Sequence, residues 1–348
     1  MTKFTLSFAS LALMLAATAI HADDKKPAPG PRAVAGNLDN PSGIAIHPET
    51  GHFFISEHRG VLRLFPQTEE GKKGMARAFE VNHFPSDIYG KGPMYDIGPL
   101  GVGFLDNEHL IVADGSRPDA SELVRIYKIG ATAPAKPAKE DSAAFTLGPV
   151  EAGDTSAKGE GNFYGVAVTN NAIHITSNGD DTKGWVLRSV ITDGKPGKLE
   201  GFIATKQDVA VDAPCAITVD KSGDLVIGQM GEVNVAADSL LLVYDAKTGK
   251  LKKQYETGLS DIIGLAYSPV TGKLYATDFS WVDSTKGGLF ELTIEGDKCT
   301  ARKVASLDKP TAIAFDAKGH AYITTFGTAE EGAKGKPGKL FRIAKGQL

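Results

Sequence analysis

The sequence predicts an all-β fold, a six-bladed β-propeller with four antiparallel strands in each blade. The first observation behind it is a repeated motif, in which a small residue begins an apolar run. The motif recurs six times, at intervals of about 48 to 64 residues. Its six anchor residues are Gly43, Gly101, Gly165, Ala216, Gly264 and Ala312. Repeats of about 40–50 residues that carry four strands each are typical of propellers.

The second observation is the strand pattern within one repeat, which is clearest in Gly258–Glu295. Three short runs rich in β-branched and aromatic residues, Ile262–Tyr267, Lys273–Asp278 and Leu289–Thr293, are separated by Gly, Pro and polar residues. Lys298–Ala305 supplies a fourth run. Runs of this length and composition are typical of antiparallel strands.

The third observation is a second column of small residues, two positions after the anchors. Its members are Ala45, Gly103, Ala167, Thr218, Ala266 and Ala314. Six strands that converge on one axis leave room only for small side chains, so a propeller explains both columns. A nucleotide-binding α/β fold does not explain the glycines, because no segment with helical periodicity follows these strands.

The repeat places every strand of the ring in order. The innermost strands are Gly43–Ile46, Gly101–Phe104, Gly165–Val168, Ala216–Val219, Ile262–Tyr267 and Ala312–Phe315. The second strands are His52–Glu57, His109–Asp114, Ala172–Ser177, Asp224–Gln229, Lys273–Asp278 and His320–Thr325. The third strands are Val61–Phe65, Leu123–Tyr127, Val186–Val190, Leu240–Tyr244, Leu289–Thr293 and Leu340–Ala344. The outer strands of the first five blades are Arg77–Val81, Ala143–Leu147, Gly201–Thr205, Leu251–Tyr255 and Lys298–Ala305.

The last blade lacks an outer strand of its own. The N-terminal stretch Arg32–Ala35 resembles Arg302–Ala305, which is an outer strand in the repeat. We therefore expect Ala33–Ala35 to complete the last blade and close the ring. Closure removes exposed sheet edges, which otherwise favour aggregation.

Two further features concern the sides of the blades. The Ala- and Pro-rich segment Gly130–Lys139 is expected to form an exposed arm. Arginines recur at matching third-strand positions, where we expect them to pack their stems and pair between blades. They are Arg63, Arg125, Arg188 and Arg342.

The first residues read as a secretion signal. Lys3 precedes the apolar run Phe4–Ile20, and cleavage is expected after Ala19 or Ala22. The alternative is a membrane anchor or a buried helix. We expect a signal peptide over 1–22, a flexible linker over 23–31, and the propeller over 32–348, in a secreted or periplasmic protein. No later apolar run is long enough to span a membrane, so no transmembrane segment is expected after removal of the signal.

The charge balance and the positions of the two cysteines argue against a nucleic-acid partner and against a disulfide. The 38 basic and 42 acidic residues give a net charge of −4, which argues against a nucleic-acid partner. Cys215 lies on a predicted innermost strand and Cys299 on a predicted outer one. Strand spacing puts them roughly 14 Å apart, too far for a disulfide. We expect a monomer.

A binding site is expected on one face of the ring, which we call the long-loop face. It carries the segments before the first strands and the polar loops after the second strands. The residues that close the second strands are Glu57, Asp114, Ser177, Gln229, Asp278 and Thr325.

The repeats, of the form (Asn/Lys)-Pro-x-(Gly/Ala)-Ile-Ala followed by an apolar residue, resemble those of NHL-type six-bladed propellers. They are also similar to the senescence-marker/gluconolactonase and strictosidine-synthase-like superfamily, over roughly Ala33 to Leu348. Lactonases of that superfamily hold an axial divalent metal with Glu, Asn and Asp placed just before the anchors. The corresponding residues here are Ser42, Leu100, Tyr164, Cys215, Ile263 and Thr311. The resemblance therefore implies no cofactor from these six residues. Ca²⁺ stays possible if Asn162 and Asp261, each two residues earlier, take part.

The predicted function is a ligand- or protein-binding module for a carbohydrate, a peptide or a protein. The ligand-binding residues expected on the long-loop face are Glu57, His58, Asp114, Asn162, Tyr164, Asp261, Asp278 and Trp281. His58 beside Glu57 could also act as a base, and an exposed Trp281 would suit a sugar or peptide. The alternatives are a metal-dependent hydrolase of the lactonase/esterase type and a structural scaffold of the cell envelope with a plugged channel. No catalytic residue follows from the sequence.

Overall fold

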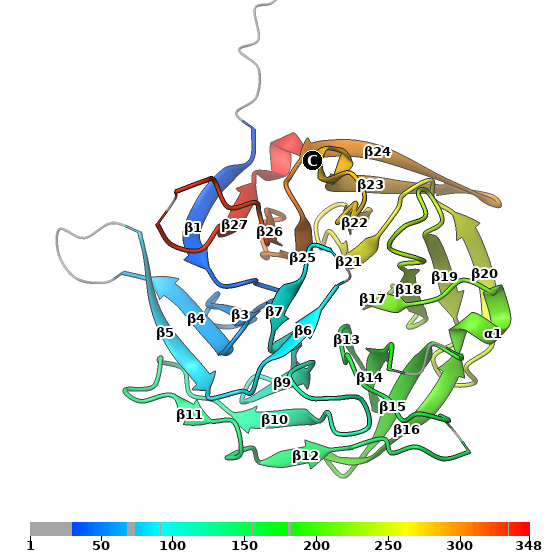
Figure 1. Cartoon of the computed structure of the whole chain (residues 1–348), viewed down its shortest axis with the longest axis horizontal. Helices are drawn as coiled ribbons and strands as arrows, with labels where there is room; N and C mark the ends of the chain where they lie inside the picture. Colours follow the sequence, from blue (N-terminus) through cyan, green and yellow to red (C-terminus); the bar gives the residue numbers. More distant parts are fainter. Residues whose placement is uncertain (1–29, 68–73, 91, 155, 180–181, 333) are drawn as a thin grey trace, which may run out of the picture.

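Six blades surround a central axis (Figure 1), as the repeat predicts. The computed structural model describes residues 30–67, 74–90, 92–154, 156–179, 182–332 and 334–348. The expected signal peptide and all but the last two residues of the expected linker lie outside the described residues.

In each blade four antiparallel strands follow one another in order from the axis outward. Blade one contains β2 (Gly43–Ile46), β3 (Phe53–Glu57), β4 (Gly60–Pro66) and β5 (Met75–Asn82). Blade two contains β8 (Pro99–Asp106), β9 (His109–Asp114), β10 (Val124–Lys128) and β12 (Phe145–Leu147). Blade three contains β13 (Val166–Thr169), β14 (Ala172–Ser177), β15 (Trp185–Thr192) and β16 (Lys195–Ala204).

The second half of the chain repeats this order. Blade four contains β17 (Pro214–Val219), β18 (Leu225–Gln229), β19 (Leu240–Tyr244) and β20 (Leu251–Glu256). Blade five contains β21 (Ile262–Tyr267), β22 (Leu274–Asp278), β23 (Gly288–Glu295) and β24 (Lys298–Ser306). Blade six contains β25 (Pro310–Phe315), β26 (Ala321–Thr325), β27 (Gly338–Ile343) and the N-terminal β1 (Arg32–Leu38).

The predicted closure is confirmed. Strand β1 pairs antiparallel with β27, with Ala33 opposite Phe341 and Ala35 opposite Leu340. The first strand of the chain therefore shares a sheet with the last, and hydrogen bonds hold the ring shut.

The anchors lie at the axis, and backbone atoms of the next blade lie close to the four glycines among them. All six anchors line one axial cavity with an empty volume of about 460 Å³. A Cβ atom at Gly101 would lie 1.9 Å from the carbonyl oxygen of Tyr164, and one at Gly165 would lie 2.4 Å from that of Cys215. The crowding that the small residues predict is therefore a contact between backbones.

Side-chain hydroxyls in the second strands link neighbouring blades near the axis. Ser56 Oγ donates to Leu100 O at 2.5 Å, from blade one to blade two. Thr176 Oγ1 donates to Cys215 O at 2.6 Å, from blade three to blade four. Thr277 Oγ1 reaches the carbonyl oxygen of Thr311 at 2.5 Å, from blade five to blade six. These bonds satisfy carbonyl groups that the packing buries.

The hydrophobic core lies between the blades. Six clusters of buried apolar residues each combine side chains of two neighbouring blades, around the whole ring. In the cluster between blades one and two, Phe54 packs at a right angle against Phe104, with ring centroids 5.2 Å apart. Each blade thus buries both faces against its neighbours, and the closed ring completes the burial.

Two segments at the outside of the blades differ in detail from the expectation. The residues of Gly130–Lys139 are exposed or half-buried as expected, but the segment is not a free arm. Its end, β11 (Ala138–Lys139), pairs in parallel with β5 as a fifth strand of blade one. The buried Arg63 donates hydrogen bonds to the carbonyl groups of Gly130 and Ala131. These bonds hold the start of the segment against blade one. In blade three the outer strand ends at Ala204, and the short helix α1 (Thr205–Val209) follows.

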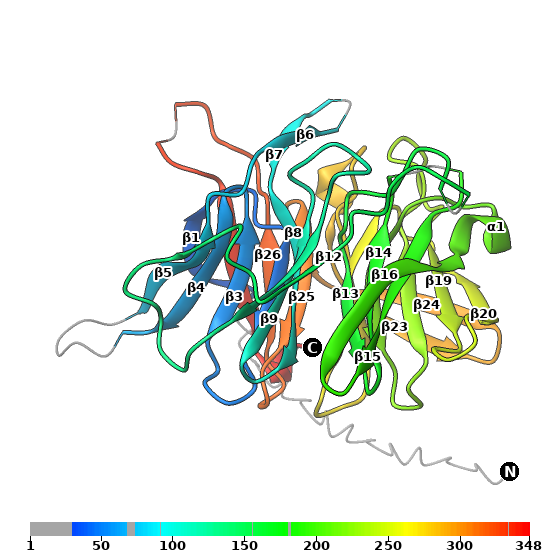
Figure 2. The ribbon, with the colours of Figure 1, turned by 90° about the horizontal axis from the view of Figure 1, so that it is seen from below.

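An additional hairpin stands on the long-loop face. Strands β6 (Asp87–Tyr89) and β7 (Tyr95–Ile97) pair antiparallel between blades one and two. The hairpin leans over the centre of the ring in Figure 1 and projects from one end of it in Figure 2. It therefore covers part of the axial channel.

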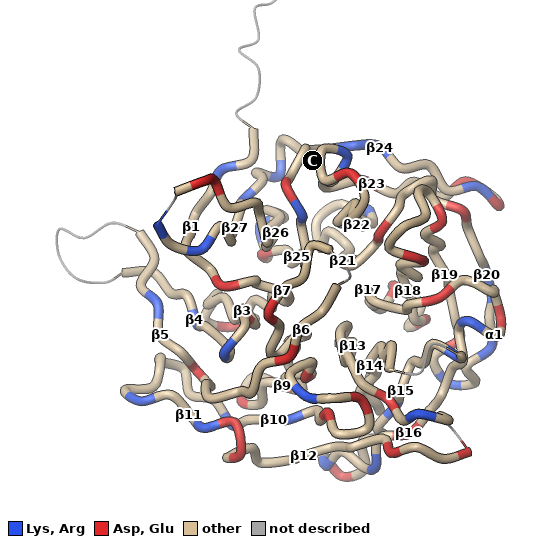
Figure 3. Tube along the Cα trace, in the orientation of Figure 1, with Lys and Arg blue, Asp and Glu red and all other residues tan. Residues whose placement is uncertain are grey.

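Charged residues lie mainly away from the axis, and the two cysteines are not crosslinked. Basic and acidic residues are interspersed around the ring, while the strands nearest the axis carry almost none of them (Figure 3). Cys215 and Cys299 are both free, on β17 and β24. Among the described residues, no helix is long and apolar enough to cross a membrane.

Candidate functional site

The channel opens on the long-loop face into an apolar cavity, which we call the axial pocket. Its empty volume is about 650 Å³, which includes the space at its mouth that is open to solvent. All six residues that precede the anchors line it, so they form its floor. They are Ser42, Leu100, Tyr164, Cys215, Ile263 and Thr311.

Tyr164 separates the axial pocket from the channel below. Its hydroxyl donates to Ser42 O at 3.2 Å, from the start of blade three to the start of blade one. Tyr164, Ser42 and Ile263 line both cavities. Burial raises the pKa of the Tyr164 hydroxyl well above its ordinary value. The side chain is therefore a neutral partition across the axis.

Aromatic side chains form the wall of the pocket. Tyr89 and Tyr95 come from the β6–β7 hairpin, whereas Phe279 and Trp281 follow β22 and Phe326 follows β26. The rings of Phe279 and Trp281 stack at 4.9 Å. Tyr95 packs edge-on against Trp281 at 5.7 Å and against Phe326 at 5.0 Å. The hairpin and two blades thus hold one another in place through this cluster.

Two polar atoms at the wall have no hydrogen-bond partner within the described part of the chain. They are the hydroxyl oxygen of Tyr95 and the amide oxygen Oδ1 of Asn178. Buried polar groups usually have partners. A ligand with a hydrogen-bonding group would therefore find partners at these positions.

Three predicted site residues line the axial pocket: Asn162, Tyr164 and Trp281. A fourth, Asp261, lies behind it, where its carboxylate accepts a hydrogen bond from the backbone amide of Trp281 at 2.6 Å. Burial raises the pKa of Asp261 to about 7. The structure thus brings these four residues together around one cavity, although they come from two blades.

The carboxylates that close the second strands are buried and hold loops. Asp278 Oδ1 accepts hydrogen bonds from the amides of Asp261 at 2.9 Å and Ser280 at 3.0 Å. Glu57 Oε2 accepts one from the amide of Asp39 at 3.2 Å, and burial raises the pKa of Glu57 to about 7. These two carboxylates fix the loops of the long-loop face from below, and their ligand-binding role stays a prediction.

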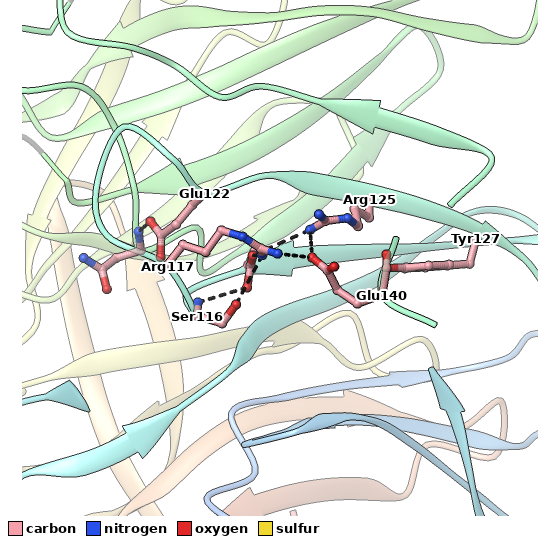
Figure 4. A network of polar contacts seen from close by, with 8 residues as sticks. Ser116, Arg117, Glu122, Arg125, Tyr127 and Glu140 are labelled. Carbon is pink, nitrogen blue, oxygen red and sulfur yellow. Dashed lines mark hydrogen bonds and ion pairs between the residues drawn. The ribbon is translucent and has the colours of Figure 1, made fainter. Parts of the chain in front are cut away.

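Asp114 belongs to a largely buried ionic network with Arg117, Arg125 and Glu140, of which Figure 4 labels the last three. Arg117 pairs with Asp114 and with Glu140, and Arg125 Nη1 lies 2.5 Å from Glu140 Oε1. The hydroxyl of Tyr127 donates to the backbone oxygen of Glu140 at 2.6 Å. The network ties the loop after β9 to the segment that follows β11, so Asp114 also has a structural partner set.

His58 lies at the foot of the hairpin with partners on both ring nitrogens. Nε2 is 2.6 Å from Ser86 Oγ, and Nδ1 is 3.3 Å from Asp39 Oδ2. The sequence pattern indicates His58 as a site residue but neither of its partners. Asp39 precedes β2 and Ser86 precedes β6, so only the folded ring brings the three together.

Glu122 is a buried carboxyl group whose raised pKa makes the stability of the fold depend on pH. It is 1% exposed, and burial raises its pKa to about 9, helped by Asp114 and Asp119. Between about pH 4.5 and 9 its carboxyl is protonated in the folded state and ionised in the unfolded state. The free energy of unfolding therefore falls as the pH rises through this window. Glu122→Gln removes that titration and keeps an oxygen for the amide of Asn162.

We expect the stability of Glu122→Gln relative to the wild type to increase by roughly 1 kcal/mol per pH unit from pH 5 to 7. Urea unfolding at each pH measures it. Glu108→Gln, at an exposed carboxylate on a turn of the opposite face, is the matched control and should show no such trend. A constant difference for Glu122→Gln would contradict the raised pKa.

A metal does not fit the axial pocket. Ca²⁺ takes 6–8 oxygen ligands, with carboxylates among them. In the ranges that the structure describes, no group of three or more His, Cys, Asp or Glu side chains could hold a metal ion. The floor instead presents apolar residues such as Leu100 and Ile263.

Comparison with known proteins finds similar solved structures but no similar sequence. No protein-family model matches the chain, and no match was found among curated protein sequences. Several solved structures are similar. A PQQ-bound aldose sugar dehydrogenase from Streptomyces coelicolor has a TM-score of 0.57 and 16% identity, over 89% of this chain and 96% of that one.

Two other solved structures show the range of proteins with this fold. A gluconolactonase from Xanthomonas campestris has a TM-score of 0.52 and 12% identity, over 91% of this chain and 95% of that one. A chain of a nidogen/laminin complex has a TM-score of 0.51 and 14% identity, over 79% of this chain and 85% of that one. The propeller arrangement is therefore shared with enzymes and with a protein assembly.

Proposed function

We propose that the protein binds a small, largely apolar organic ligand in the axial pocket. The observation that carries this proposal is the lining: five aromatic side chains over an apolar floor, at the mouth of the channel. No Lys, Arg, Asp, Glu or His among the described residues lines the pocket. Burying an uncompensated charge in such a site is unfavourable, so a neutral aromatic or aliphatic group fits best.

This proposal narrows the partners expected from the sequence. A free sugar offers mostly hydroxyl groups, whereas the pocket offers few polar partners beyond the hydroxyl of Tyr95 and the amide of Asn178. An aromatic compound that bears one or two hydrogen-bonding groups would use both the wall and these atoms. Export, a monomeric state and the signal peptide stay predictions.

Tryptophan fluorescence tests the proposal, because the chain has only two tryptophans. Trp185 lies on β15, so Trp185→Phe leaves Trp281 as the single reporter at the pocket. We expect the neutral probe N-phenyl-1-naphthylamine to quench Trp281 in a saturable way. Adding Trp281→Ala should raise the dissociation constant for the probe at least 10-fold, because a large aromatic contact is lost.

The Trp185→Phe variant alone is the control and should bind the probe as the wild type does. Fluorescence of the probe itself reports binding to the Trp281→Ala variant. Probe binding that does not saturate, or that is unchanged by Trp281→Ala, would show that the axial pocket is not the ligand site.

A second candidate function is a hydrolase of the lactonase or esterase type. The similarity to a gluconolactonase structure supports it at the level of the fold. A metal-dependent mechanism has no support from the floor of the pocket, so the hydrolase would need a nucleophile from the chain itself. Sugar dehydrogenation with PQQ is not proposed: PQQ carries three carboxylates, and no cationic residue of the described chain lines the pocket.

A further inference from the structure

We propose that Ser86, His58 and Asp39 form a catalytic triad on the long-loop face, with which the protein hydrolyses esters or lactones without a metal. The inference deepens the second candidate function, because it names the nucleophile and the base. The substrate class rests on the proposed function, since the acyl group would be the apolar ligand. The triad itself rests only on its own geometry.

The distances suit nucleophilic catalysis. Ser86 Oγ lies 2.6 Å from His58 Nε2, within hydrogen-bond reach of a base. Asp39 Oδ2 lies 3.3 Å from His58 Nδ1. When Nδ1 donates its proton to Asp39, Nε2 has a free lone pair and accepts the hydroxyl proton of Ser86. This is the arrangement of donor and acceptor that a serine nucleophile requires.

The fold holds the histidine and the acid in place. The amide of His58 donates to Asp39 O at 2.9 Å, and the amide of Asp39 donates to Glu57 at 3.2 Å. A Cβ atom at Gly98 would lie 1.9 Å from the His58 backbone oxygen, so the chain that leaves β7 packs directly against the backbone of His58. Lys336 Nζ lies 2.9 Å from the other oxygen of Asp39 and helps to orient its carboxylate.

The nucleophile of the triad is exposed to solvent, whereas the base is almost fully buried. Ser86 is exposed to solvent, so a substrate reaches its hydroxyl. The His58 side chain is 8% exposed, and that of Asp39 is 23% exposed. The base is therefore shielded while the nucleophile stays accessible. Ser86 is three residues before Tyr89, roughly 10 Å along an extended chain, so the apolar end of a substrate can reach the axial pocket.

The reaction proceeds in two steps. Ser86 Oγ attacks the carbonyl carbon while His58 Nε2 takes the hydroxyl proton. The bond from this carbon to the leaving oxygen then breaks, and His58 returns the proton to that oxygen. Water next attacks the acyl–Ser86 ester, His58 takes a proton from the water, and Ser86 leaves with it. One ester and one water give one acid and one alcohol; a lactone gives one hydroxy acid.

Two measurements on the full-length chain, in the presence of a chelator, test the triad. Phenylmethylsulfonyl fluoride should sulfonylate Ser86 with loss of fluoride, and peptide mass spectrometry locates the adduct. Hydrolysis of p-nitrophenyl butyrate should fall at least 100-fold in Ser86→Ala and in His58→Gln. The two losses should not add in the double variant, because both residues serve one step.

Asp39→Asn tests a positioning residue. We expect it to lower kcat at least 10-fold with KM unchanged, because it disturbs the tautomer of His58 and not the binding of substrate. Ser142→Ala, at an exposed serine on the outer side of blade two, is the matched control and should keep full activity and the Ser86 adduct.

The outcomes separate this proposal from the proposed function. No adduct on Ser86 in the folded wild type, or full hydrolysis by Ser86→Ala, would overturn the triad. Trp281→Ala should weaken probe binding yet leave labelling of Ser86 intact, because the sulfonyl fluoride does not need the axial pocket. Labelling of Ser86 without saturable probe binding would therefore support the triad and refute the pocket.

Discussion

Gly101→Ala is expected to lower the free energy of unfolding by about 3–5 kcal/mol. The new Cβ would lie 1.9 Å from the carbonyl oxygen of Tyr164 and 3.1 Å from a methyl group of Val166. The first neighbour is backbone, which cannot rotate away. Blades two and three would have to move apart at the axis, where their innermost strands are already in backbone contact.

Denaturant unfolding of wild type and variant measures this loss. Gly346→Ala is the control, because no heavy atom lies within 4 Å of a Cβ at that position. Its effect should stay within about 0.5 kcal/mol. A loss below about 1 kcal/mol for Gly101→Ala would mean that the axis is not tightly packed and that the small-residue columns have another cause.

The same contact explains why the fold could be predicted from the sequence. Backbone crowding leaves a visible trace, since each blade must place a small residue at the axis. Each predicted second strand also ends at the residue where the structure ends it, from Glu57 in the first blade to Thr325 in the last. The repeat predicts these positions because the second strand of every blade pairs with an innermost strand in the same arrangement.

The segments between repeats were harder to predict. The hairpin of β6 and β7 follows no repeat, although Asp-Ile-Tyr and Tyr-Asp-Ile flank a glycine-rich turn and could have indicated it. The segment Gly130–Lys139 carries no apolar pattern because backbone carbonyls, not side chains, bind it to Arg63. Contacts of this kind leave no periodic signal.

The site was predicted only in part for a related reason. Asn162, Tyr164 and Trp281 are predicted on the long-loop face and line the axial pocket, while their ligand-binding role stays a prediction. The aromatic wall depends on the hairpin, which the repeat does not contain. Ser86 and Asp39 meet His58 across 28 and 19 residues, and no motif spacing links them. A site assembled from loops that differ between blades has to be located in the folded ring.

Arg63→Met is expected to lower the free energy of unfolding by about 3–5 kcal/mol, because it leaves a buried carboxylate without its partner. Arg63 is fully buried, and its Nη1 lies 3.1 Å from Glu80 Oε2. Nη1 and Nη2 also donate to the carbonyl oxygens of residues 130 to 132 at 2.9 to 3.0 Å. Burial raises the pKa of Glu80, and Arg63 opposes that shift.

Thermal and urea unfolding measure the loss, and a second substitution separates its causes. Arg63→Met with Glu80→Gln removes the unpaired charge, so part of the stability should return, while the three carbonyl groups stay without their donor. Arg342→Met, at the matching and only partly buried position of blade six, should cost less than about 1 kcal/mol. Equal losses at Arg63 and Arg342 would mean that the recurring arginine acts through its stem alone. A larger loss at Arg63 would show that its charged head fixes the segment joining blades one and two.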